Sequence, residues 1–95
     1  MGDMNEFGLR VADEAVEYLR LIAASMIEQF GVSPREATGR VAEYFAGRQL
    51  VSPMQVDLLL HQDEQHWAGQ IYYDDHRWRD ERTRGEPAPY PRRLH

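Results

Sequence analysis

The 95-residue chain contains no cysteine and no lysine. Without cysteine it cannot form a disulfide framework, a thiolate metal site or a thiol nucleophile. No apolar run approaches the roughly 18 residues that a membrane-spanning helix needs, and the first residues lack the basic-then-apolar order of a signal peptide. We therefore expect a soluble protein of the reducing cytoplasm that has no membrane partner.

The charge is acidic overall and unevenly distributed. All eleven basic residues are arginine, and the formal net charge is −5. Residues 77–95 carry six arginines against three acids, which leaves a net −8 on the first 76 residues. Because an acidic body repels phosphate backbones, the composition weighs against nucleic-acid binding.

The length corresponds to one domain near the lower limit of what a single hydrophobic core supports. A chain of this size can gain stability by burying a further surface against another protein. A homodimer would do this with a second copy of the same surface.

Apolar residues recur at helical spacing along most of the chain. The longest pattern predicts a helix over about 9–30, ended by a glycine. Ser33 and Glu36 have the spacing of a capping box, which predicts a second helix over 34–46. Gly39 lies inside this helix at a cost of about 1 kcal/mol relative to alanine, so we expect a neighbouring helix to approach closely there.

Two shorter helices are predicted after these. A serine-proline pair begins an apolar run that has the length of either a helical turn or a buried strand. The proline and the shortage of β-branched residues favour a helix over 53–61. Asp63 is a suitable N-cap for a fourth helix over 63–73. The predicted fold class is therefore all-α, a bundle of three to four helices.

The C-terminal segment 79–95 is rich in proline and arginine and has no periodicity. Proline removes an amide donor and disfavours helix in the preceding residue. We therefore expect a helical domain over 1–78 and an extended or disordered, flexible tail. The Pro-Ala-Pro-Tyr-Pro sequence within the tail has the character of a polyproline-type ligand for an aromatic groove.

The segment 61–78 concentrates the chemically able groups, with three of the four histidines and both tryptophans. His61, Glu64 and His66 are candidates for a metal site or for acid/base catalysis. The two histidines are five residues apart, whereas ligands on one helical face come three or four apart, so the metal signal is weak. We favour solvated groups at a helix start, and we predict no catalytic residues and no cofactor.

Two further groups of residues are candidates for binding. Trp78 between Arg77 and Arg79 would suit a protein interface, where Trp and Arg are enriched. Packing that anchors the tail is the favoured alternative for this tryptophan. The second predicted helix and the turn before it also have the look of a helix-turn-helix, in which Arg35 and Arg40 would face DNA.

The order of residues in the middle of the chain resembles a family of small bacterial proteins that has no established activity. The resemblance covers about half of the chain and rests on a Gly-Val-Ser-x-x-Glu-Ala helix start, a histidine-acid stretch, Trp-Ala and Ile-Tyr-Tyr. The matching residues are Gly31, Val32, Ser33, Glu36, Ala37, Gly39, His61, Asp63, Trp67, Ala68, Ile71, Tyr72 and Tyr73. The resemblance implies one co-folded domain and a bacterial source, and it implies no catalytic residues. Asp74 and Asp75 stand here where the family often continues with glycine.

The predicted function is a non-enzymatic protein-interaction module or regulator that binds another protein or itself. Two alternatives remain open. One is a helix-turn-helix DNA-binding protein, and the other is a metal-binding or acid/base enzyme built on the segment 61–66.

Overall fold

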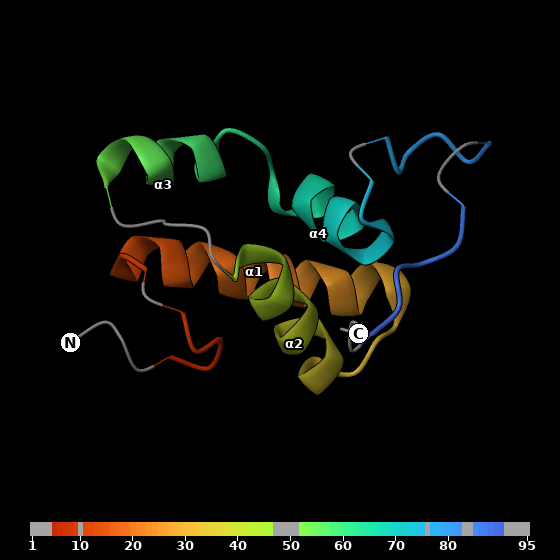
Figure 1. Ribbon diagram of the computed structural model, residues 1–95, viewed down its shortest axis with the longest axis horizontal. Helices are drawn as coiled ribbons and strands as arrows, with labels where there is room; N and C mark the ends of the chain where they lie inside the picture. The colour runs from red at the N-terminus through yellow and green to blue at the C-terminus, as the bar shows by residue number, and fades with distance from the viewer. Residues whose placement is uncertain (1–4, 10, 47–51, 76, 83–84, 91–95) are drawn as a thin grey trace.

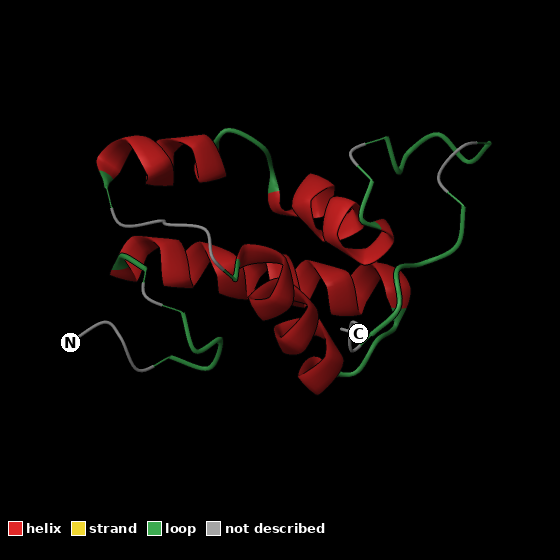
Figure 2. Cartoon of the chain, viewed as in Figure 1, coloured by secondary structure: helices red, strands yellow, loops and turns green. Residues whose placement is uncertain are grey.

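Four α-helices form the regular structure of the part of the chain that the structure describes (Figure 1). The computed structural model describes residues 5–9, 11–46, 52–75, 77–82 and 85–90. The helices are α1 (Asp13–Phe30), α2 (Pro34–Phe45), α3 (Pro53–Leu60) and α4 (Glu64–Tyr73). The described residues contain no strand (Figure 2), which confirms the all-α prediction, and α2, α3 and α4 agree with their predicted bounds to within one residue. No helix in this part of the chain is long and apolar enough to cross a membrane.

Helix α1 is the central element. It packs against α2, α3 and α4, and α2 also contacts α4. Figure 1 shows α3 along the N-terminal half of α1 and α4 along its C-terminal half, while α2 crosses α1. The core therefore centres on α1, and the largest fully buried side chains are Leu19, Ile22, Met26 and, from α2, Val41.

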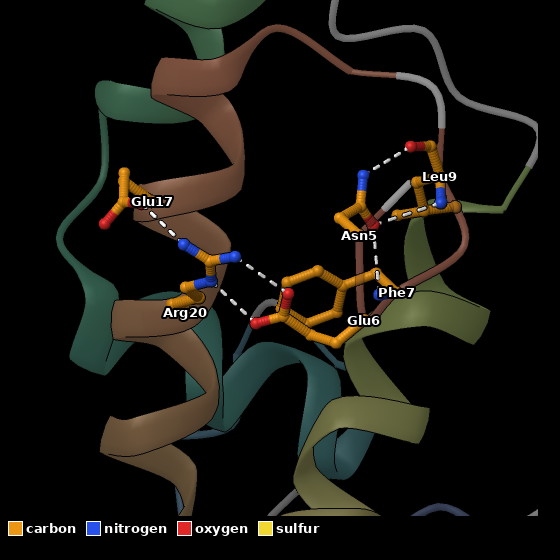
Figure 3. A network of polar contacts seen from close by, with 6 residues as sticks. All are labelled: Asn5, Glu6, Phe7, Leu9, Glu17 and Arg20. Carbon is orange, nitrogen blue, oxygen red and sulfur yellow. Dashed lines mark hydrogen bonds and ion pairs between the residues drawn. The ribbon is translucent and has the colours of Figure 1, made fainter. Parts of the chain in front are cut away.

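Helix α1 begins at Asp13, later than the predicted start near residue 9, because the Asn5 side chain organises the preceding segment. Its Oδ1 accepts hydrogen bonds from the backbone N–H groups of Phe7 (3.0 Å) and Leu9 (3.3 Å), and its amide donates to the Leu9 carbonyl (2.7 Å) (Figure 3). The last of these bonds occupies the Leu9 carbonyl, which a helix from residue 9 would have used as an acceptor. The resulting turn places Phe7 in the core, where the helical pattern did not predict it.

Arg20 fastens this N-terminal turn to α1. Its Nε and Nη2 atoms bind the two carboxylate oxygens of Glu6 at 2.7 and 3.0 Å, and its Nη1 binds Glu17 at 2.6 Å (Figure 3). The hydrogen bonds from Arg20 lower the pKa of the Glu6 carboxyl. Because water and salt screen exposed charges of this kind, the ion pairs chiefly fix the position of the turn.

The reciprocal capping box predicted for α2 is found at α3 instead. Ser33 Oγ accepts from the backbone N–H of Glu36 (3.0 Å), but the Glu36 carboxylate binds Arg40 Nε (2.8 Å). At α3, the side chains of Ser52 and Gln55 each accept from the other residue's backbone N–H, at 3.3 and 3.0 Å. The arginine one turn along α2 has therefore drawn away the carboxylate that would have completed the first box.

Two glycines inside helices let aromatic rings of the C-terminal segment reach the helix backbone. A Cβ at Gly69 in α4 would meet the indole of Trp78, and a Cβ at Gly39 in α2 would meet the phenol of Tyr90. The expectation that a neighbouring helix approaches Gly39 is thus wrong, because a ring of the tail approaches it. Trp78 is 8% exposed, and its indole N–H donates to the His66 carbonyl (3.0 Å).

The described part of the tail is irregular and mostly exposed, and it returns to the helices at Ala88 and Tyr90. Residues 79–82 and 85–90 contain no helix. The backbone N–H of Ala88 donates to the Tyr72 carbonyl in the last turn of α4 (2.8 Å). The tail therefore joins the body through this bond and through the rings of Trp78 and Tyr90.

Gly69→Ala tests the close approach of Trp78 to α4. At a solvent-exposed position inside a helix, this substitution stabilises the folded protein by about 1 kcal/mol. Here the new Cβ would displace a buried indole, so we expect the free energy of unfolding to fall by about 1–3 kcal/mol, measured by urea denaturation.

The control is the same substitution in a Trp78→Ala background. Without the indole, Gly69→Ala should be neutral or stabilising. An equal effect in both backgrounds would show that the two residues are energetically independent.

Candidate functional site

The polar segment between α3 and α4 does not bring its candidate ligands together. In the part of the chain that the structure describes, no group of three or more His, Asp or Glu could hold a metal ion. His61, Glu64 and His66 therefore do not converge as the metal alternative requires. His61 is exposed at the end of α3, whereas Asp63 caps α4 by accepting from the backbone N–H of His66 (2.7 Å).

Helix α1 holds this junction by two side chains. The Tyr18 hydroxyl donates to the Gln62 carbonyl, and the side-chain amide of Gln29 donates to the Gln65 carbonyl at 3.2 Å. Burial raises the pKa of the Tyr18 phenol, and the negative charge of the two nearby carboxylates raises it further. Because both bonds end on backbone carbonyls, they fix the path of the chain from α3 to α4.

Arg40 is buried, with 8% of its surface exposed, and it joins α2 to α4. Its Nε donates to Glu36 at 2.8 Å and its Nη1 to the Tyr72 carbonyl at 3.4 Å, while the guanidinium lies 4.7 Å from the centre of the Tyr72 ring. Carbonyls in the last turn of a helix lack helical partners and carry the negative end of the dipole. Helix α4 has no basic residue in its own last turn, so Arg40 supplies the cation from α2.

This position of Arg40 removes the basic face that the DNA-binding alternative requires. Arg35 is exposed near the start of α2, but Arg40 lies on the buried face of the helix together with Ala37 and Val41. Contacts with DNA need guanidinium groups that can reach phosphates or base edges. The two arginines therefore do not share the exposed face that the DNA-binding alternative requires.

Trp78 lies in the body of the protein, and its neighbouring arginines lie at the surface. The indole stacks on Tyr73 with 6.4 Å between ring centroids and meets Phe30 edge-on at 6.1 Å. The guanidinium of Arg79 covers the indole at 4.8 Å, and both Arg77 and Arg79 are exposed. Trp78 thus anchors the C-terminal segment, which was the favoured alternative, and is not an exposed recognition residue.

Helix α3 carries three of the four large apolar side chains that are exposed among the described residues. Two of them form what we call the α3 face, Met54 at 74% and Leu58 at 66% exposed, and the third, Leu60, is 45% exposed at the end of the helix. The buried residues of α3 are Val56 and Leu59. Met54 and Leu58 are one helical turn apart, so they share a side of the helix, and that side is opposite to the buried pair.

Helix α3 is attached to the body on one side. Of the other helices, it packs against α1, and the Trp67 indole of α4 adds one hydrogen bond to the Leu59 carbonyl (2.7 Å). Asp57 is the single charged residue within α3. The outward side is therefore apolar and nearly free of charge, as at many interaction surfaces.

The periodicity of the α3 run did not show which of its apolar residues are buried, so the α3 face was not among the predicted sites. A signal for it was present in the sequence. Five of the eight residues are apolar, and they lie all round the helix axis, whereas a helix with one neighbouring helix buries only one stripe. The excess of apolar residues indicated an exposed apolar side.

No protein-family model matches the chain, and neither a curated protein nor a solved structure is significantly similar to it. The resemblance to small bacterial proteins stays a prediction. Function is therefore inferred from the residues themselves, and the α3 face and the surroundings of Arg40 are the two places that offer chemistry for binding.

We expect Tyr18→Phe to lower the free energy of unfolding at neutral pH by about 0.5–1.5 kcal/mol, the usual net value of one hydrogen bond. Because burial raises the pKa of Tyr18 in the folded state, the contribution of this phenol is fully present below the unfolded pKa of roughly 10 and is lost as pH rises through the folded value. Wild type should therefore lose more stability in alkali than Tyr18→Phe. Urea unfolding from neutral to strongly alkaline pH measures the difference, and parallel pH profiles would contradict it.

Arg40→Lys tests whether the shape of the guanidinium matters as well as its charge. A lysine cannot bind Glu36, reach the Tyr72 carbonyl and lie flat on a ring at the same time. We expect a loss of about 1.5–3 kcal/mol in urea denaturation, the range for hydrogen bonds to charged groups. Arg35→Lys, at an exposed position of the same helix, is the matched control, and equal stability of the two variants would refute this role.

Proposed function

We propose that the protein is an interaction module that acts by binding a second copy of itself through the α3 face, and not by catalysis. The observation that supports this is the exposure of Met54 and Leu58 on the outward side of a helix that packs on its other side. Complete burial of a Leu or Met side chain contributes about 1.5–3 kcal/mol. In a twofold contact, both copies contribute the same residues.

The distribution of charge is compatible with a second copy at the α3 face. The chain has a net charge of −5, so two copies repel each other wherever their acidic surfaces meet. Asp57 is the one charged residue of α3. Contact at this helix therefore brings two copies together with little repulsion. It also buries apolar surface that so small a domain does not cover with its own residues.

The position of α3 also suits such a contact. Figure 1 shows α3 at the outside of the molecule, at the end remote from the described part of the C-terminal segment. A second copy can therefore reach it without displacing Trp78 or Tyr90. The alternatives have no comparable support, since Arg40 is buried and paired and the described acids and histidines form no metal-ligand group.

Leu58→Glu tests the proposal in size-exclusion chromatography with light scattering over a wide range of concentrations. Wild type should be a dimer, and Leu58→Glu should be a monomer, because a carboxylate is costly to bury in an apolar contact. Ala24→Glu is the matched control. Ala24 is exposed and follows Arg20 by one turn of α1, so the variant adds the same charge on a different face and should remain dimeric.

A wild-type chain that is monomeric at every concentration would overturn self-association. So would a different protein from the native lysate that wild type and Ala24→Glu retain and Leu58→Glu loses, since the α3 face would then have another occupant. Circular dichroism of each variant establishes that the helices are intact.

A further inference from the structure

We propose that Gly39, Arg40 and Tyr72 form a binding site for extended, proline-flanked tyrosine segments, and that residues 87–90 of the chain occupy this tyrosine site in the structure. The Tyr90 ring lies against the backbone at Gly39. The Arg40 guanidinium is 5.5 Å from the centre of the same ring. The backbone N–H of Ala88 donates to the Tyr72 carbonyl at 2.8 Å.

Gly39 makes room for the ring. It lies in the interior of α2, where glycine is the least favourable residue apart from proline. Any other residue would place a Cβ where the phenol of Tyr90 lies. Because Gly39 has no side chain, an aromatic ring can reach the surface of the helix at this position.

The other contacts of Arg40 fix its guanidinium where it can bind an aromatic ring. Glu36 binds its Nε at 2.8 Å, and the Tyr72 carbonyl accepts from its Nη1 at 3.4 Å. The guanidinium lies over the Tyr72 ring at 4.7 Å as well as over Tyr90. A fixed cation that faces a ring attracts it through the quadrupole of the ring, and little side-chain entropy remains to be lost on binding.

The prolines determine the shape of the occupant. Pro87 and Pro89 have no backbone N–H, so Ala88 carries the one backbone donor between them, and this donor meets the Tyr72 carbonyl. Proline also restricts a peptide to extended conformations before it binds, which lowers the cost of ordering it. The site therefore recognises the spacing from a backbone donor to a tyrosine ring two residues later.

These contacts depend on the chemistry of the segment and not on its covalent connection to α4. The chain's own segment is a competitor at high effective concentration. A segment of the same chemistry in another molecule would bind when Tyr90 is absent or displaced. None of the contacts involves the α3 face, so the proposal is independent of self-association.

The test uses the full chain with Tyr90→Ala, which leaves the tyrosine site without its ring. The probe is a fluorescently labelled peptide Gly-Glu-Pro-Ala-Pro-Tyr-Pro, the sequence of residues 85–91, followed by anisotropy. Tyr90→Ala should bind this peptide at least roughly tenfold more tightly than wild type, in which the internal segment competes. A peptide with alanine in place of the tyrosine should not bind.

Three further variants, each made in the Tyr90→Ala chain, identify the site. Gly39→Ala should abolish binding, because the added Cβ occupies the space of the ring and alanine preserves the helix. Arg35→Ala should leave binding unchanged, which excludes simple attraction between an exposed arginine and an acidic peptide. Leu58→Glu should also leave it unchanged, which separates this site from the α3 face.

The proposal is overturned if Tyr90→Ala binds the peptide no better than wild type does, or if Gly39→Ala leaves binding intact. A second measurement uses wild type with a large excess of unlabelled peptide. Displacement of the chain's own segment should shift the NMR resonances of the Tyr90 ring and of the Ala88 N–H, because these groups leave the site. Unchanged resonances of both groups at saturating peptide would also refute the site.

Discussion

The carbonyl oxygen of Tyr72 receives two donors, the guanidinium of Arg40 at 3.4 Å and the backbone N–H of Ala88 at 2.8 Å. It lies in the last turn of α4, where the helix offers a carbonyl no partner of its own and carries the negative end of its dipole. Buried carbonyls need a donor, and here one comes from α2 and one from the tail. One helix end thus joins three separate segments, and a cation and two tyrosine rings meet there.

The two ends of the molecule differ because of what covers them. At the end near α4, Gly39 and Gly69 are unfavourable for the helices that contain them. They leave space in which Tyr90 and Trp78 lie on the helix backbone. Phe30 extends the aromatic layer by stacking on Tyr72 at 4.2 Å. The chain covers this end with its own C-terminal segment, whereas the described residues place no comparable segment over the outward side of α3. The two proposals follow from this difference, since one end has an internal occupant and the other exposes apolar residues.

The helices could be predicted because their signals are local. Spacing and caps determine where α2, α3 and α4 begin and end, and Ser33, Ser52 and Asp63 all act as N-caps. The predictions failed where a side chain from elsewhere intervened. Asn5 occupies the Leu9 carbonyl, which an earlier start of α1 would have used, and Arg40 binds the carboxylate of the expected capping box. The exposed side of α3 and the position of the Tyr90 ring depend on where neighbouring segments lie. Periodicity alone does not determine those positions.

Helix α3 depends on its surroundings more than the other helices do. It has eight residues, and an isolated helix of that length is marginal in water. Its capping box, its packing on α1 through Val56 and Leu59, and the Trp67 bond to the Leu59 carbonyl supply what local propensity does not. A partner on the opposite side would bury Met54 and Leu58 only while the helix is formed. Binding at the α3 face would therefore be coupled to formation of α3, and each would stabilise the other.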